Sequence, residues 1–222
     1  MRIAIAGIIL TTIVGIGAGI ARLSDNWLVR NLSLVYVEIF RNTPLLLQLL
    51  FWYSAVFLGL PKVENKLSLG NLIYLSQASI EFPWFTLAPE FSALLLGLIF
   101  YTGSFIAEIV RGGIQSVPKG QWEASVSLGL KPSLTMRLVV FPQALRVIIP
   151  PLTSQYLNLT KNSSLAIAIG YPDIYFVAST TFNQTGRAVE VMLLIMLTYL
   201  TISLITSVSM NIFNRTVQIK ER

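Results

Sequence analysis

Four long stretches of this chain carry no charged residue, and they constrain its fold more than any other feature. They cover residues 3–21, 42–61, 91–107 and 191–214. Each is long enough, or nearly so, to cross about 30 Å of hydrocarbon as an α-helix. Only 12% of the residues are charged, whereas an average soluble domain has about 25%. A solvent-exposed monomer is therefore excluded, and a membrane protein is expected.

A fifth apolar segment, residues 145–170, contains Lys161 together with several amides and hydroxyls. With it, the chain accommodates roughly five spans of about 20 residues each. The predicted fold is all-α, with five transmembrane helices in one polytopic domain over residues 1–222. The predicted spans cover about residues 1–21, 42–61, 91–110, 145–170 and 189–212. Residues 67–80 are short, more polar and flanked by prolines, so we expect them outside the membrane or at its surface.

The distribution of Lys and Arg predicts the orientation, because cytoplasmic loops of membrane proteins are enriched in these residues. With the N-terminus extracytoplasmic and the C-terminus cytoplasmic, 11 of the 16 basic residues fall on the inner side. They are Arg22, Arg30, Arg41, Arg111, Lys119, Lys131, Arg137, Arg146, Arg215, Lys220 and Arg222. The outer side holds Arg2, Lys62, Lys66 and Arg187. Trp84 and Phe85, near the end of the outer loop, are expected to anchor it at the interface.

The first uncharged stretch resembles either a cleaved signal peptide or a retained span. Its 19 residues exceed a usual signal-peptide core. Gly7, Thr11, Gly15 and Gly19 recur every four residues and place small groups on one helix face, which permits close helix–helix contact in lipid. A retained span is favoured, and a longer natural N-terminus is left open.

The chain contains no Cys and no His. This excludes disulfides, thiolate nucleophiles, zinc sites built on Cys or His, and catalytic triads that use His. It also contains no Gly-x-x-x-x-Gly-Lys-Ser/Thr loop to bind nucleotide phosphates. We therefore expect no catalytic residue, no metal and no cofactor in this chain, and any ATP-driven step requires a partner.

The segment before the fourth span predicts a helical elbow within residues 112–142. Ser116 is expected to cap a helix that has an early Pro118 and runs to about Leu128. Gly129 follows at the position where helices favour a left-handed residue. A second helix is predicted from Pro132 and enters the membrane near Pro142. A push on such an elbow would be transmitted to the span.

These residues resemble the EAA loop of ABC-importer permeases. The matching positions are Glu123-Ala124-Ser125, Gly129 and Val139-Val140-Phe141-Pro142, with departures at Ser125, Val139 and Phe141. Residues 37–45, 105–113, 142–146 and 165–173 are similar to the polar amino-acid permeases, a group that includes histidine, glutamine, arginine and general L-amino-acid systems. The resemblance covers about residues 22–213 and is accompanied by an outer loop similar to that of the general L-amino-acid branch.

The resemblance implies a permease in a bacterial plasma (inner) membrane. It implies pairing with a second permease, identical or not, with a cytosolic ABC ATPase dimer that binds ATP and Mg²⁺, and with an extracytoplasmic solute-binding protein. The expected ATPase-coupling residues are Trp122, Glu123, Ala124, Gly129 and Pro142, with Trp122 or Leu128 as an apolar anchor. The alternative for this segment is an ordinary amphipathic surface helix.

A polar face of the fourth span predicts a substrate path. Ser154, Asn158 and Lys161 share one helix face, with Asn162 and Ser163 beside them. Lipid cannot satisfy such a face, so it must contact protein or water. Lys161 is expected to face a carboxylate of the substrate or of the protein. The alternatives are snorkelling of Lys161 toward the outer interface and an interhelical hydrogen-bonded seam.

Three further features accompany these sites. Glu108 and Arg111, like Glu38 and Arg41, are three residues apart near the inner side, and we interpret each as a local ion pair at a helix end. An inner gate is the alternative for Glu108 and Arg111. Pro150-Pro151 predicts a kink or break in the fourth span.

The sequence therefore predicts the permease subunit of an ATP-driven amino-acid importer that works by alternating access. The alternatives are an ABC permease for another small solute, an ion-coupled secondary transporter and a structural membrane subunit. An ion-coupled carrier would not need the EAA-like loop, and a structural subunit would not need the polar face around Lys161.

Overall fold

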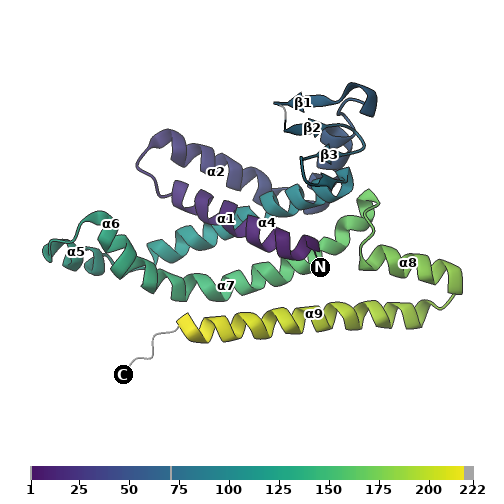
Figure 1. Ribbon diagram of the computed structural model, residues 1–222. Coiled ribbons are helices and arrows are strands. Elements are labelled where there is room, and N and C mark those ends of the chain that lie inside the picture. The colour runs from purple at the N-terminus through teal and green to yellow at the C-terminus, as the bar shows by residue number, and fades with distance from the viewer. Residues whose placement is uncertain (1, 71, 218–222) are drawn as a thin grey trace.

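A computed structural model of the chain describes residues 2–70 and 72–217. Long helices lie side by side in a bundle that has a small β-sheet near one end and two short helices at the other (Figure 1). We call these the sheet end and the α5 end. The α-helices are α1 (Arg2–Ala21), α2 (Trp27–Asn42), α3 (Leu45–Leu50), α4 (Pro89–Gln115), α5 (Lys119–Ser127), α6 (Pro132–Thr135), α7 (Phe141–Asn162), α8 (Ile174–Thr185) and α9 (Ala188–Val217). The π-helical segments are η1 (Phe51–Phe57) and η3 (Met136–Val140), and the 3₁₀ segments are η2 (Val63–Asn65) and η4 (Ser163–Ile169).

Four helical segments in the described residues are long and apolar enough to cross a membrane. They are Ile3–Ala21, Pro89–Gln115, Pro132–Ile169 and Ala188–Arg215. The third joins α6, η3, α7 and η4 without a break, so the predicted fourth span is the central part of a longer helical rod. The predicted all-α membrane fold is confirmed, with the small sheet as an addition.

The second span differs from the expected segment 42–61. Within that segment the structure has only α3 and η1, which are together too short to cross about 30 Å. They form a broken pair with α2, bent by 106°. Gln48 holds the corner, because its Nε2 donates to the carbonyls of Phe40 at 2.9 Å and Thr43 at 3.1 Å. The sequence prediction began too late because α2 carries three charged residues, which end the uncharged run.

Helix α1 packs closely on α4, as its row of small residues predicted. Gly7, Thr11, Gly15 and Gly19 are all buried. A Cβ added to Gly15 would lie 2.5 Å from the Ile106 side chain, and one added to Gly19 would lie 2.7 Å from the Ala107 carbonyl. The absent side chains therefore allow the two backbones to approach.

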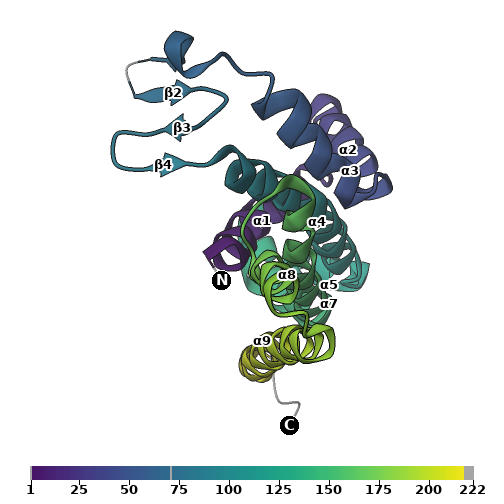
Figure 2. The same cartoon turned by 90° about the vertical axis from the view of Figure 1, so that its right-hand side faces the viewer.

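Residues 62–88 contain an antiparallel sheet with the strand order β1 (Leu67–Leu69), β2 (Ile73–Leu75), β3 (Ile80–Glu81) and β4 (Thr86–Leu87). Its register pairs Leu67 with Leu75, Tyr74 with Glu81 and Ile80 with Leu87. The sheet projects away from the helices (Figure 2). Its strands have two or three residues, too few to show an alternating sequence pattern. Trp84, in the β3–β4 turn, is 90% exposed and makes the expected role as an anchor sterically possible.

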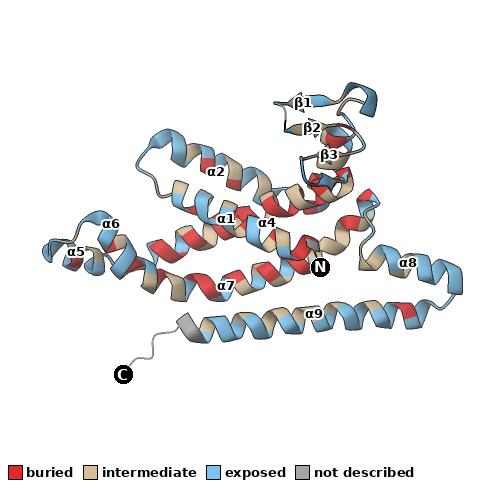
Figure 3. Cartoon of the chain, viewed as in Figure 1, coloured by how far each residue is buried: buried red, intermediate tan, exposed pale blue. Residues whose placement is uncertain are grey.

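Buried residues concentrate in α4 and the facing parts of α1 and α7, whereas α9 is exposed along most of its length (Figure 3). Only 6% of the apolar window of α9 is buried within the chain. Because residues 191–214 carry no charge, this surface must face lipid or another polypeptide.

Candidate functional site

The elbow at the α5 end is built by a complete glycine C-cap. Helix α5 ends at Ser127, and Gly129 has φ +75°. The Leu130 N–H donates to the Ser125 carbonyl at 3.1 Å and the Gly129 N–H donates to the Val126 carbonyl at 2.9 Å, which is the Schellman arrangement. A Cβ at Gly129 would meet no atom within 4 Å. Glycine is therefore required by the backbone conformation and not by crowding.

The N-terminal side of the elbow differs from the prediction. Residue Pro118 is the N-cap of α5. The Ser116 hydroxyl donates to the Gly113 carbonyl at 2.7 Å, so it terminates α4 and does not cap α5. The preceding helix runs through Gln115, which brings Ser116 into its last turn.

The side chains of α5 that were expected to contact an ATPase differ in their exposure. Trp122 is half-buried and packs against the buried cluster that includes Val117 and Val140. Glu123 and Ala124 are exposed. Leu128 is 80% exposed, so of the two residues expected as an apolar anchor it is the more accessible.

The elbow is joined to the span without an intervening loop. Helix α6 begins at Pro132 and leads through η3 into α7, where Pro142 lies in the first turn. Thr135 and Val140 are buried at 1% and 0% exposure. In Figure 1 this rod runs from α6 along the whole bundle. A displacement of the elbow would therefore be carried into α7.

The polar face of α7 is open. Ser154, Asn158 and Lys161 are all exposed, and Asn162 and Ser163 are half-buried. The Ser163 hydroxyl donates to the Thr160 carbonyl at 2.9 Å. In the part of the chain that the structure describes, Lys161 forms no ion pair. The face thus presents a cation and several amide and hydroxyl groups that α7's neighbours within the chain do not cover.

The predicted kink or break at Pro150-Pro151 is not seen as an interruption, because α7 is continuous from Phe141 to Asn162. Both prolines are exposed on the same open face. A proline in a helix removes the N–H that would bond four residues back. The change of helix type instead occurs at Ser163, where the 3₁₀ segment η4 begins and then ends at Gly170 with φ +74°.

The predicted Glu108–Arg111 pair is present, with Arg111 Nη2 at 2.7 Å from Glu108 Oε2. Glu108 also accepts a hydrogen bond from Arg22 Nη1 at 2.6 Å, which the sequence prediction did not include. The sequence places Arg22 directly after a predicted span, near the inner side. Because Arg22 and Glu108 are 86 residues apart, no local pattern indicated that they would meet.

The predicted ion pair between Glu38 and Arg41 is wrong. Glu38 accepts a hydrogen bond from Asn42 Nδ2 at 2.8 Å, and the Arg41 guanidinium lies 5.5 Å from the centre of the Phe105 ring. Phe105 is inside α4, well before its end at Gln115. Arg41 therefore stacks on an aromatic ring of α4.

Asp173 is a further polar group that the sequence prediction did not assign. It follows η4, and its Oδ2 accepts a hydrogen bond from the Tyr199 hydroxyl of α9 at 3.1 Å. It lines cavities of about 240 and 460 Å³ at the sheet end. The contact attaches α9 to the end of the α7–η4 rod.

Among the described residues, no group of three or more His, Cys, Asp or Glu side chains is arranged to hold a metal ion. The features with functional chemistry are therefore the elbow, the open face of α7 and the Arg22–Glu108–Arg111 cluster. The elbow is suited to contact a partner protein, the open face of α7 to line a polar path, and the cluster to hold α1 and α4 together.

Comparisons with known proteins identify the class. Residues 11–219 match the family of binding-protein-dependent transport system inner membrane components. The general L-amino acid transport system permease protein AapQ of Rhizobium johnstonii is 40% identical over 100% of this chain and 75% of its own length. The putative amino-acid ABC transporter permease protein YhdX of Escherichia coli K12 is 41% identical over 97% of this chain and 75% of its own length.

Solved structures of ABC transporters have the same fold as this chain. An amino acid ABC transporter crystallised with histidines has a chain with a TM-score of 0.77 and 26% identity, matched over 97% of this chain and 89% of that one. The inward-facing MetNI methionine ABC transporter shares the fold, with a TM-score of 0.72 over 98% of this chain and 92% of that one, at 17% identity.

The chain belongs to the family of inner-membrane permease subunits of binding-protein-dependent ABC transport systems. Its resemblance to the polar amino-acid permeases is confirmed. Such subunits are not themselves enzymes, since ATP hydrolysis belongs to a separate subunit. Family membership also argues against the ion-coupled carrier and the purely structural subunit.

Proposed function

We propose that this chain forms the membrane path of an amino-acid importer. The amino-acid cargo is supported by the amino-acid transport assigned to the relatives AapQ and YhdX. The polar residues Ser154, Asn158, Lys161, Asn162 and Ser163 line the path, and a second permease, identical or not, covers the open face of α7. An extracytoplasmic solute-binding protein delivers the amino acid.

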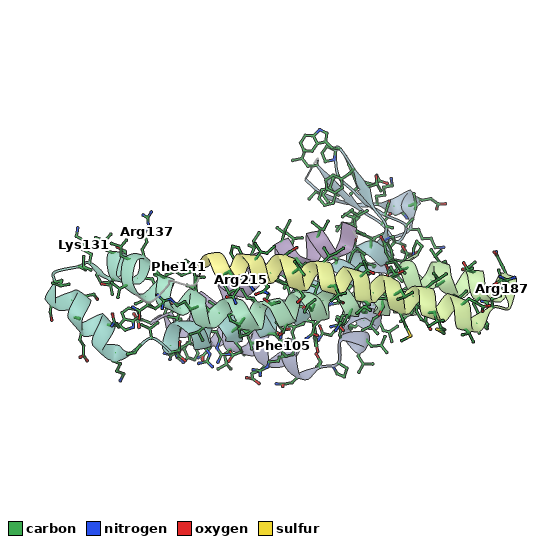
Figure 4. All side chains as sticks on the ribbon, turned by 90° about the horizontal axis from the view of Figure 1, so that it is seen from below. Phe105, Lys131, Arg137, Phe141, Arg187 and Arg215 are labelled. Atoms are coloured by element: carbon green, nitrogen blue, oxygen red, sulfur yellow. The ribbon has the colours of Figure 1, made fainter. Side chains whose placement is uncertain are left out.

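The α5 end lies in the cytoplasm in this proposal, with the N-terminus extracytoplasmic. Lys119, Lys131, Arg137 and Arg215 support this placement, because basic residues favour the cytoplasmic side. Figure 4 shows Lys131, Arg137 and Arg215 toward the α5 end, and Arg187 at the opposite end of α9. Lys220 and Arg222, which were assigned to the same side, lie outside the described residues.

The elbow docks on a cytosolic ATPase that binds ATP and Mg²⁺. The single observation that carries this step is the glycine C-cap at Gly129, joined to α7 by one helical rod. The contact surface is formed by Glu123, Ala124 and Leu128, with the half-buried Trp122 beside them. Gly129 and Pro142 set its direction. ATP-driven closure of the ATPases moves the elbow and reorients α7, which alternates access to the path.

Gly129→Val tests the coupling. A β-branched residue is strained at positive φ, so we expect this variant to insert normally but to lose uptake and co-purification with the ATPase. Gly129→Asn should retain most uptake, because Asn tolerates the left-handed conformation. Gly120→Ala is the matched control on α5, since its added Cβ meets no atom within 4 Å. Normal uptake by Gly129→Val would contradict the proposal.

A further inference from the structure

An apolar groove with a volume of about 610 Å³ opens between α1, α4 and the start of α7, toward the α5 end. Gly17 and Ile20 line it from α1, Val110 from α4, and Leu145 and Leu152 from α7. Apart from Ser24, all its lining residues are apolar. Its volume is in the range of cavities that enclose drug-sized ligands.

The groove is open at Gly17 because this residue has no side chain. A Cβ added there would meet nothing within 4 Å, whereas Gly15 and Gly19 on the same helix face the tight contact with α4. Ile20 is 56% exposed beside it. Because α1 and α7 are membrane-length helices, an opening between them faces either lipid or a partner helix.

The side of α7 on which the groove opens favours lipid over a partner helix as its occupant. Leu145, which lines the groove, and Ser154, on the open polar face, are nine residues apart, or about two and a half helical turns. They therefore point to opposite sides of α7. A partner permease seated on the polar face, as proposed above, leaves this groove exposed to the bilayer.

Positive charge lies at the mouth of the groove. Arg137 directly follows the lining residue Met136, and Lys131 precedes α6. Both are exposed, and neither forms an ion pair within the residues that the structure describes. Figure 4 shows both side chains projecting from the α6–η3 segment, with Phe141 nearby. On the α1 side Asp25 follows the lining residue Ser24, and Arg22 is already paired with Glu108. The exposed Arg30, which follows the lining residue Val29, adds a further positive charge.

We infer that this groove binds an anionic phospholipid of the cytoplasmic leaflet, with one acyl chain between α1 and α7 and its phosphate on Arg137. Apolar lining residues favour the chain, and guanidinium groups bind phosphate oxygens through charge-assisted hydrogen bonds. Basic sites between transmembrane helices on the cytoplasmic side recognise anionic head groups in this way.

Native mass spectrometry of the purified full chain tests the site, with phosphatidylglycerol and phosphatidylcholine as the probes. We expect tighter binding of phosphatidylglycerol. Arg137→Gln should weaken phosphatidylglycerol binding about fivefold. It should weaken phosphatidylcholine binding less, because the choline ammonium group already neutralises the charge of that phosphate. Gly17→Leu should fill the groove and weaken both at least tenfold. Gly112→Leu and Arg187→Gln are matched controls, because Gly112 also has open space around it and Arg187 lies at the opposite end.

Three outcomes would overturn the inference. One is wild-type lipid binding by Gly17→Leu, and another is equal affinity of the wild-type chain for the two lipids. The third is a change of oligomeric mass in Gly17→Leu with lipid binding retained, which would make the groove a protein interface. The assay needs no transport, so a failed lipid site and a failed transport proposal give different results.

Discussion

Arg22 Nη1 donates a hydrogen bond to Glu108 Oε1 across 2.6 Å, and this contact ties the C-terminal end of α1 to α4. The two side chains are only 13% and 18% exposed. Arg111, one helical turn along α4, binds the other carboxylate oxygen at 2.7 Å. Glu108 therefore neutralises two arginines from two elements at the same end of the bundle.

Replacing Glu108 by Gln should lower the free energy of unfolding by about 1–2 kcal/mol, because it leaves two partly buried arginines without a countercharge. Thermal unfolding in detergent measures the change. A double-mutant cycle with Arg22→Gln should show coupling. The control is Glu81→Gln in the more exposed Lys66–Glu81 pair, whose loss should cost less than about 1 kcal/mol. An equal loss for both substitutions would argue against a special role for Glu108.

Gly15→Leu should destabilise the bundle by about 1–3 kcal/mol, because overpacked contacts force backbone shifts. The added Cβ would lie 2.5 Å from Ile106. Gly17→Leu, two residues along the same helix, should have little effect on thermal unfolding because its Cβ meets no atom within 4 Å. Similar melting temperatures for the two variants would contradict the packing of α1 on α4.

The sequence predicted those parts of the fold whose signal is local. The four-residue repeat of small side chains on α1 marked the buried face, and Gly129 marked the elbow, because each depends on residues within one or two turns. The Arg22–Glu108 contact joins residues 86 positions apart, and no local pattern encodes it. The charge pattern also predicted the wrong partner for Arg41, because its guanidinium lies over the Phe105 ring and not beside Glu38.

The open face of α7 was predictable as a polar stripe, but its surroundings were not. Whether Ser154 and Lys161 are covered depends on where α1, α4 and α9 pack around the helix. The same holds for Trp122, which was expected to act as an apolar anchor and is half-buried against the cluster that includes Val117 and Val140.

The sheet should lose local stability in acid. Hydrogen bonds from Lys66 and Ser79 hold the pKa of the Glu81 carboxyl below its usual value of 4.5. A carboxyl whose pKa is depressed by folding contributes stability above its unfolded pKa, and this contribution disappears as the pH falls through the folded value. Protection of residues 67–87 against hydrogen exchange, corrected for the intrinsic exchange rate at each pH, should therefore fall below about pH 4.5. Glu81→Gln should remove that dependence, and unchanged acid sensitivity in this variant would assign the effect to another group.

Lys161→Ala should reduce amino-acid uptake at least tenfold, equivalent to about 1.4 kcal/mol, without lowering the amount of protein in the membrane. The side chain is exposed on the open face of α7, so its removal leaves no internal cavity, and its loss acts on whatever occupies the path. Lys161→Arg keeps the charge and should retain part of the activity. Arg187→Ala, at the far end of α9, is the control for removing a cation and should transport normally. Unchanged uptake kinetics in Lys161→Ala would favour snorkelling toward the interface, whereas a fall in membrane abundance would indicate that Lys161 stabilises contact with the second permease.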